Sequence, residues 1–382
     1  MNKLLLIVLV VLAAGCKEKF VSPVPQVESG YLVVEGVAND GGGQTNIRLS
    51  RTTRLDNAAI TKETGAVVKL EGSNNLSLPL IETIPGNYTI DNLQLDPSVK
   101  YRLSITTTNN QEYLSDFVSV RPNPPIDSVN WVRDGDGVHI FVDTHNPQNN
   151  SLYYQWEYEE TWEFHSAYAT TLKYERFPPP NSHLISGVIF RDQSDPQIYA
   201  CWQFNSSSTL LLGSSAKLSR DIIHLPLTSV PPASWKMSVL YSIFVRQYAW
   251  SKEGYEFLEK MKKNTENVGS VFDAQPSELN GNIHCMTDPS QQVIGFFNIC
   301  TIREQRIWIY NSQLPRWGYS PGCREEIIEN NKDSIAAKAL GKLPVEPEKW
   351  NPFGGIETFY AAPDGCVDCT IKGTNVKPTY WP

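Results

Sequence analysis

The chain has 382 residues, of which 41% are hydrophobic and 19% charged, so it is long enough to bury several cores and is not typical of a disordered protein. Its formal net charge at pH 7 is −8, and its lysines and arginines form no cluster. These features exclude a nucleic-acid-binding surface and steering toward anionic phosphates, and leave proteins, peptides and neutral ligands open as partners.

The chain begins with a short apolar run, residues 4–16, that ends in small residues and a cysteine. A membrane-spanning helix needs about 20 apolar residues, so the run is too short for a transmembrane anchor. No polar residue interrupts it, which disfavours a buried amphipathic helix. Ala14-Gly15-Cys16 fits a bacterial lipoprotein signal. We therefore expect residues 1–15 to be a cleaved signal peptide and Cys16 to carry the lipid.

A tether and a first domain are expected next. Residues 16–29 combine charged residues with Pro23 and Pro25 and have little to bury, which favours a lipidated tether. From residue 30 hydrophobic and polar residues alternate, with the hydrophobic ones at Ile47 and Leu49 and at Tyr101, Leu103 and Ile105. Period-two alternation between turn residues predicts a small β-sandwich over residues 30–121.

A proline-rich stretch at residues 122–125 marks a domain boundary. A second β domain is expected over residues 126–312. Its strands are predicted at 138–142, 154–158, 184–190, 198–204, 208–213, 237–247, 293–301 and 306–310.

One amphipathic helix is expected inside this second domain, over residues 251–264, with Ser251 as the N-cap. Its apolar side chains share one face, which we expect to pack on the domain: Tyr255, Phe257, Leu258 and Met261.

The C-terminal extension, residues 313–382, shows a short helical pattern near 324–340 and is otherwise rich in Pro, Gly and Cys. Such a segment buries too little apolar surface to offset the entropy of ordering it. We expect it to pack on the second domain and to be held there by disulfides. The predicted fold is thus mainly β, with two tandem antiparallel β-sandwiches and a stapled, loop-rich extension.

Six cysteines remain once Cys16 is lipidated: Cys201, Cys285, Cys300, Cys323, Cys366 and Cys369. An even number in an exported chain predicts disulfides, with fifteen pairings open. We expect Cys323 to pair with Cys366 or Cys369, and at least one further bridge among Cys201, Cys285 and Cys300. Cys366-Val367-Asp368-Cys369 and His284-Cys285 also offer tetrahedral zinc ligands, an alternative disfavoured because oxidising compartments convert thiols to disulfides.

Four carboxylates lie close together in the sequence: Glu157, Glu159, Glu160 and Glu163. Glycosidases use two carboxylates about 5 to 10 Å apart. Glu157 and Glu159 fall on the polar side of the predicted strand, which indicates solvated side chains instead. Glu160 falls on the apolar side and marks a strand end, a β-bulge or a buried carboxylate.

Aromatic residues of the same segment suit stacking on a sugar or peptide: Trp156, Tyr158, Trp162 and Phe164. Core packing accounts for Trp156 and Tyr158, whereas Trp162 lies nearer a predicted loop. Candidate ligand-binding residues are therefore Trp162, Phe164 and Glu160.

Sequence motifs for catalysis are absent: the chain has no Gly-x-Ser-x-Gly elbow, no Gly-x-x-x-x-Gly-Lys loop and no His-Glu-x-x-His helix. Its six histidines are scattered. We therefore predict no catalytic residue, no bound metal and no cofactor.

Motifs spread over nearly the whole mature chain carry a family resemblance. They are Tyr31-Leu32-Val33-Val34-Glu35-Gly36, Pro85-Gly86-Asn87-Tyr88, Cys201-Trp202, residues 211–218, Lys263-Asn264-Thr265-Glu266, Phe272-Asp273-Ala274-Gln275-Pro276-Ser277, Gly281-Asn282-Ile283-His284-Cys285, Cys366-Val367-Asp368-Cys369 and Asn375-Val376-Lys377-Pro378. Together they resemble the domain-of-unknown-function 4249 family of Bacteroidota outer-membrane lipoproteins.

The resemblance implies a lipoprotein encoded beside a TonB-dependent receptor, with an immunoglobulin-like or transthyretin-like N-terminal sandwich and no assigned activity. Lys17-Glu18-Lys19 is charged as surface-export signals in this phylum tend to be. The leading hypothesis is a non-catalytic, lipid-anchored protein of the outer membrane, exposed at the cell surface, that helps a TonB-dependent receptor capture a nutrient. An adhesin or envelope scaffold is the first alternative, and a hydrolase of glycans or peptides the second.

Overall fold

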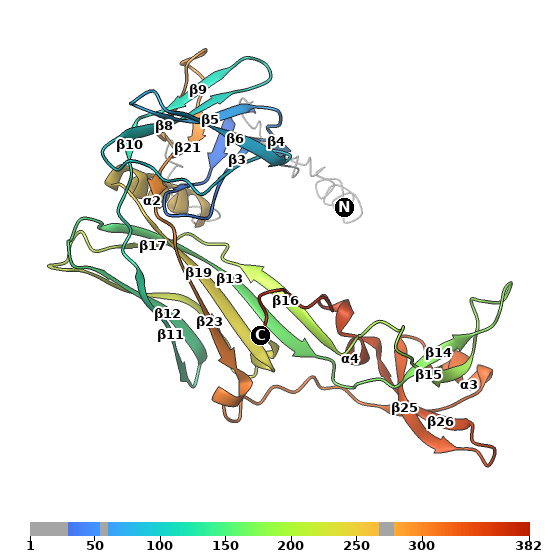
Figure 1. Cartoon of the computed structure of the whole chain (residues 1–382). Helices are drawn as coiled ribbons and strands as arrows, with labels where there is room; N and C mark the ends of the chain where they lie inside the picture. Colours follow the sequence, from blue (N-terminus) through green and yellow to red (C-terminus); the bar gives the residue numbers. More distant parts are fainter. Residues whose placement is uncertain (1–29, 54–59, 267–278) are drawn as a thin grey trace, which may run out of the picture.

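The computed structural model describes residues 30–53, 60–266 and 279–382. The predicted signal peptide and the whole predicted tether, residues 16–29 with Cys16, lie outside these residues. Strands predominate in the described chain, which confirms the mainly β prediction. None of its helices, within the same described residues, has the length and apolar character needed to cross a membrane. Three parts follow one another in an elongated, bent molecule (Figure 1).

The N-terminal part, at the top of Figure 1, is an eleven-stranded sheet that curls until it is nearly closed. Its main path runs β20 (Ile283–Cys285), β9 (Glu112–Ser115), β8 (Lys100–Thr106), β5 (Val67–Gly72), β6 (Ser77–Ile84), β7 (Asn87–Asp91), β3 (Gln44–Arg51), β1 (Leu32–Glu35) and β21 (Val293–Gly295). Shorter strands complete it: β10 (Val118–Ser119) pairs with β8, and β4 (Thr61–Lys62) with β3. The hydrophobic residues of β3 and β8 point into one core, as their alternation predicts.

Two strands that close this sheet, β20 and β21, come from the segment that the sequence assigns to the second domain. Gly281 fits here because a Cβ at this position would lie 1.6 Å from the carbonyl oxygen of Gly295. The buried Asn282 amide donates to the carbonyl of Phe297 (2.9 Å) and accepts from its N–H (2.7 Å). Nearby, β2 (Ala38–Asn39) pairs with β22 (Ile299–Cys300). A separate sandwich over residues 30–121 is therefore not confirmed.

The central part consists of two sheets that share one core. One sheet has the order β11 (Ile126–Asp134), β12 (Gly137–Asn146), β18 (Asp221–Val230). The other has the order β16 (Ala200–Ser206), β13 (Tyr153–His165), β19 (Leu240–Ala249), β23 (Arg303–Tyr310), and β17 (Leu211–Ser214) also pairs with β13. Two connections contain short 3-10 helices: η1 (Trp235–Met237) lies between β18 and β19, and η2 (Asn311–Gln313) follows β23 directly.

Helix α2 (Lys252–Glu266) joins the central part to the N-terminal part and confirms the predicted amphipathic helix. The Ser251 hydroxyl accepts a hydrogen bond from the N–H of Gly254 (3.0 Å), as expected of an N-cap. Its apolar face packs in a core with Tyr248 of β19, with Trp250 directly after that strand and with Cys300 of β22.

The distal part, at the lower right of Figure 1, contains the hairpin β14 (Leu172–Arg176) and β15 (Ile185–Phe190). It also contains a sheet of β24 (Glu326–Glu329), β26 (Ile356–Pro363) and β25 (Lys342–Trp350), with helix α3 (Lys332–Lys338). Both sheets supply one core, so the C-terminal extension has more regular structure than its sequence predicts. The predicted helix at 324–340 is wrong over its first residues, which form β24.

The chain end returns to the central part, as predicted. After α4 (Asp364–Val367) and η3 (Cys369–Ile371), the backbone of Thr374 pairs with that of Trp202 in β16. Trp381 packs edge-on against Trp308 with ring centroids 4.8 Å apart. The Trp381 indole N–H donates to the Glu163 carboxylate at 2.8 Å.

Candidate ligand-binding site

Glu160 of β13 is a buried carboxylate, one of the three alternatives that its place on the apolar side allowed. Its side chain is 1% exposed. The Tyr241 hydroxyl donates to Oε1 (2.7 Å), while Asn205 Nδ2 (2.8 Å) and Lys236 Nζ (2.7 Å) donate to Oε2. Burial, with Glu160 beside it, raises the pKa of Tyr241 well above its usual range. The carboxylate is fully engaged by protein groups.

Trp162 and Phe164 are each 4% exposed, so neither offers a free ring face to a ligand, and the expectation that Trp162 lies near a loop is wrong. Both lie inside β13, which is 13 residues long, and not near a loop. Their rings pack edge-on against Trp235, with centroids 5.5 and 4.7 Å apart. The Lys236 ammonium lies 4.7 Å from the Trp162 centroid. All three predicted ligand-binding residues thus contact η1 on the side that faces the core.

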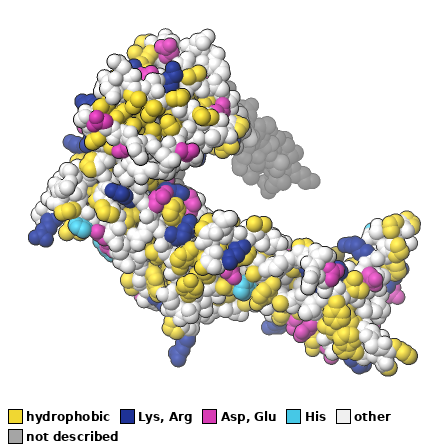
Figure 2. Space-filling view, in the orientation of Figure 1, with side chains coloured by type: hydrophobic (Ala, Val, Ile, Leu, Met, Phe, Trp, Pro, Cys, Tyr) yellow, Lys and Arg dark blue, Asp and Glu magenta, His cyan; other side chains and the backbone are white. Residues whose placement is uncertain are grey.

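The neighbouring glutamates face the other side of the sheet and are also engaged. Arg246 binds Glu159 (2.7 Å) and Glu304 (3.1 Å), and the Tyr248 hydroxyl donates to Glu157. Charged side chains of both signs lie together on this face (Figure 2). Because Glu160 points inward and its neighbours outward, the four carboxylates do not form one site.

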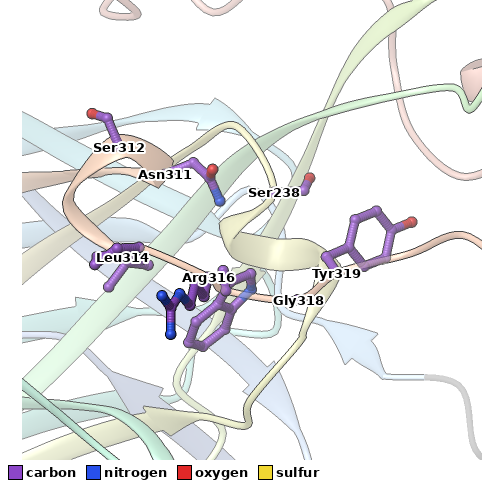
Figure 3. Close-up of a pocket in the computed structure, with 9 residues that line it drawn as sticks. Ser238, Asn311, Ser312, Leu314, Arg316, Gly318 and Tyr319 are labelled. Atoms are coloured by element: carbon purple, nitrogen blue, oxygen red, sulfur yellow. The ribbon is translucent and has the colours of Figure 1, made fainter.

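An open hollow of about 400 Å³ lies beside η1, at the end of the central sheets. Its lining comes from the end of η1 and from the segment after β23: Ser238, Asn311, Ser312, Leu314, Pro315, Arg316, Trp317, Gly318 and Tyr319. Figure 3 shows Arg316 between Leu314 and Tyr319, with Asn311 and Ser238 above it. The volume is within the range of small-molecule sites.

The two walls of the hollow are tied to each other by hydrogen bonds. Asn311 Nδ2 donates to the carbonyl of Met237, and the Trp317 indole N–H donates to that of Ser234, each at 2.7 Å. Arg133 of β11 donates to the carbonyl of Pro315 (2.6 Å). The ion pair of Glu160 and Lys236 anchors η1 on the core side. The hollow is therefore preformed on a rigid framework.

Several polar groups of the hollow remain unused by the protein. The Ser238 hydroxyl oxygen is buried and has no hydrogen-bond partner among the described residues. Arg316 is exposed and forms no ion pair within the same part of the chain. Burial raises the pKa of Tyr319. Sequence reasoning missed Arg316 and Tyr319 because they lie in an aperiodic segment, and it placed Ser238 in a predicted strand. The only signal is the arginine between Pro315 and Trp317, which indicates a surface turn.

The family known as Domain of unknown function (DUF4249) matches residues 17–306 of the chain. The chain belongs to this family. No curated protein matches it. The DUF4249 match includes Ser238 and the Glu160 cluster, and ends before the wall formed by residues 311–319.

Of the two disulfides, one joins the DUF4249 region to the C-terminal extension and the other lies within that extension. Cys323 pairs with Cys366, as predicted, and Cys201 pairs with Cys369. The Cys366 and Cys369 thiols are both consumed, so the alternative zinc site is wrong; the described residues contain no group of three or more metal-binding side chains. Cys201 thus takes the second bridge to the extension, and the predicted bridge among Cys201, Cys285 and Cys300 does not form.

Cys285 and Cys300 are free and buried, which corrects their assignment as disulfide cysteines. Cys285 is in β20 of the N-terminal sheet, and Cys300 in β22 beneath α2. Burial raises the pKa of the Cys300 thiol to about 12. The thiol therefore stays protonated at physiological pH and is a poor nucleophile.

Titration of free thiols in the absence of reductant tests the two disulfides and the two buried thiols. We expect the native protein to react with almost no Ellman's reagent at pH 8, because only the thiolate reacts and both thiols are buried. In guanidinium chloride the lipidated protein should release two thiols per chain, Cys285 and Cys300, and a chain with unacylated Cys16 should release three. Release of four or more would contradict the two disulfides.

Proposed function

We propose that this DUF4249 protein is a non-catalytic binding protein, anchored by a lipid on Cys16 to the outer membrane of a Bacteroidota cell and exposed at its surface. In this proposal it captures a small ligand in the hollow and works with a TonB-dependent receptor that imports the ligand. The observation that carries the proposal is the preformed hollow with the exposed Arg316 guanidinium in its lining. Rigid sites with unused polar groups favour binding.

The arrangement of the carboxylates supports binding over hydrolysis. A glycosidase needs one protonated and one ionised carboxyl facing the same substrate. Here the acids of β13 point to opposite faces, and each described one is bound by a tyrosine, lysine, arginine or histidine. The histidine contact also lowers the pKa of Glu163, which favours its ionised form.

An adhesin or scaffold is the second candidate, favoured by the tip of the distal part. Phe190 and Trp350 stack with ring centroids 5.9 Å apart, yet are 49% and 51% exposed, and Phe353 in the β25–β26 turn is 98% exposed. Hydrophobic side chains gather at this end of the molecule (Figure 2). Exposed aromatic patches are typical of protein-binding surfaces.

Purification from native membranes in mild detergent separates these candidates. We expect the wild-type protein to co-purify with a TonB-dependent receptor, and Cys16→Ala to be released from the membrane fraction because no thiol remains to be acylated. Co-purification with envelope proteins but no receptor would favour the scaffold. Membrane retention of Cys16→Ala would overturn the lipid anchor.

A further inference from the structure

The charge of the hollow differs from the charge of the whole chain. Its lining contains one cationic side chain, Arg316, and no acidic one, although the chain carries a net charge of −8. Nearly every other guanidinium around the central sheets is engaged: Arg246 by carboxylates, and Arg133 by the carbonyls of Pro315 and Arg316. A planar guanidinium with free N–H groups is suited to bidentate binding of a carboxylate.

The backbone of Arg316 is held in an unfavourable conformation. Its φ is +59°, in the left-handed region that non-glycine residues rarely adopt. The conformation is maintained by the bonds from Arg133 to the adjacent carbonyls and by Trp317, whose indole N–H is tied to Ser234. Glycine would relieve the strain, but would leave the hollow without its cation. Strained residues of this kind concentrate at binding sites.

The other polar side chains of the hollow are uncharged, so they are better suited to hydroxyl groups of a ligand than to additional charged groups. Asn311 lies in the lining, and its Oδ1 remains an acceptor while its Nδ2 is bound to the carbonyl of Met237. Burial keeps the Tyr319 hydroxyl protonated, since its pKa is raised, so it can donate a hydrogen bond. One fixed positive charge and several neutral polar groups match a monoanion that carries hydroxyls.

The size of the hollow limits the ligand to a small molecule. With liquid water occupying about 30 Å³ per molecule, roughly a dozen waters would fill it. A monosaccharide acid or a sugar-derived hydroxy acid is of that size, whereas a folded protein or a long glycan could enter only with one end.

We propose that the hollow binds a small hydroxylated monocarboxylate, with Arg316 holding the carboxylate and Asn311 and Tyr319 holding hydroxyl groups. The inference rests on the proposed binding function and names its ligand class. Phosphate is the disfavoured anion because a large fraction of it is a dianion at neutral pH, whereas the described lining offers a single cation.

Calorimetric titration of the full lipidated chain in detergent tests the ligand class. The probes are glucuronate, gluconate and lactate, with glucose and inorganic phosphate for comparison, each up to about 10 mM, which exceeds the millimolar end of the affinity scale. We expect at least one monocarboxylate to bind, and glucose to bind about tenfold more weakly or not at all, since a charge-assisted hydrogen bond is lost. Failure of all three monocarboxylates, equal binding of glucose, or tighter binding of phosphate would overturn the proposal.

Two substitutions test the residues. Arg316→Asn removes the charge with a residue that tolerates the left-handed conformation, so the fold should be kept and monocarboxylate affinity should fall at least about tenfold. Arg324→Asn, which changes the same charge outside the lining, should leave affinity unchanged. Circular dichroism checks that both variants fold. If Arg316→Asn binds the monocarboxylate with wild-type affinity, the ligand binds at another place on the protein and the inference is wrong.

The two proposals can fail separately. Binding of a monocarboxylate by a protein that co-purifies with no receptor would leave the ligand class standing and overturn the uptake function. Co-purification with a receptor, together with binding of glucose but not of monocarboxylates, would support the uptake function and overturn the ligand class.

Discussion

Replacing Lys236 with methionine should lower the free energy of unfolding by about 3 kcal/mol, because it leaves the Glu160 carboxylate buried without its cation. We expect the lower end of the range for broken buried ion pairs, since Tyr241 and Asn205 still donate to the carboxylate. The fall should appear in urea unfolding followed by tryptophan fluorescence, to which Trp162 and Trp235 beside the ion pair are expected to respond.

Two further variants show whether the buried charge is the cause. Adding Glu160→Gln to the Lys236→Met variant removes the unpaired charge and should recover much of the loss. Lys349→Met removes a lysine whose pair with Glu357 is exposed, with side chains 61% and 42% accessible, and should cost at most about 1 kcal/mol. Equal losses for Lys236→Met and Lys349→Met would contradict the buried pair.

Opening the disulfide between Cys201 and Cys369 should have the second large effect, a loss of about 2 to 5 kcal/mol. The bond closes a loop with a sequence separation of 168, so its absence gives the unfolded chain much more freedom. The test is urea unfolding of the double variant Cys201→Ala/Cys369→Ala without reductant.

The second disulfide provides a matched comparison. Cys323 and Cys366 are separated by 43 residues, and the dependence of loop entropy on length makes the longer bridge worth about 1 kcal/mol more. Both cysteines of the longer bridge are also nearly inaccessible, at 0% and 1%, so alanine leaves a cavity there. A larger loss from Cys323→Ala/Cys366→Ala would contradict this order.

The local elements of this protein follow from short-range sequence patterns. The alternation at Tyr101, Leu103 and Ile105 predicted β8, and the apolar face after Ser251 predicted α2 within two residues at its C-terminal end. Glu160 was identified as exceptional because it breaks the alternation of its strand. Each of these inferences depends on residues only a few positions apart, for which strand and helix geometry fix the direction of the side chains.

The partition of the chain into three parts was not predictable in this way. Strands β20 and β21 pair with β9 and β1, far away in sequence, and the hairpin β14–β15 shares its core with β24 and β26. Their sequences show that they are strands but not with which strands they pair. Many pairings bury the same apolar residues, and only the packing of the whole chain selects among them.

The sequence by itself determined the mainly β class, the amphipathic helix, the resemblance to DUF4249 and the unusual position of Glu160. Each of these depends only on the spacing of residues a few positions apart or on short motifs. Only the tertiary structure decided that Glu160, Trp162 and Phe164 support η1 from inside the core, that Cys201 pairs with Cys369, and that Ser238 and Arg316 line one hollow. Ser238 and Arg316 are 78 positions apart, the first in a predicted strand and the second in a segment without periodic pattern. Their proximity arises from the pairing of β19 with β23. The free energy of the whole fold selects this pairing, and the sequence of a short segment does not determine it.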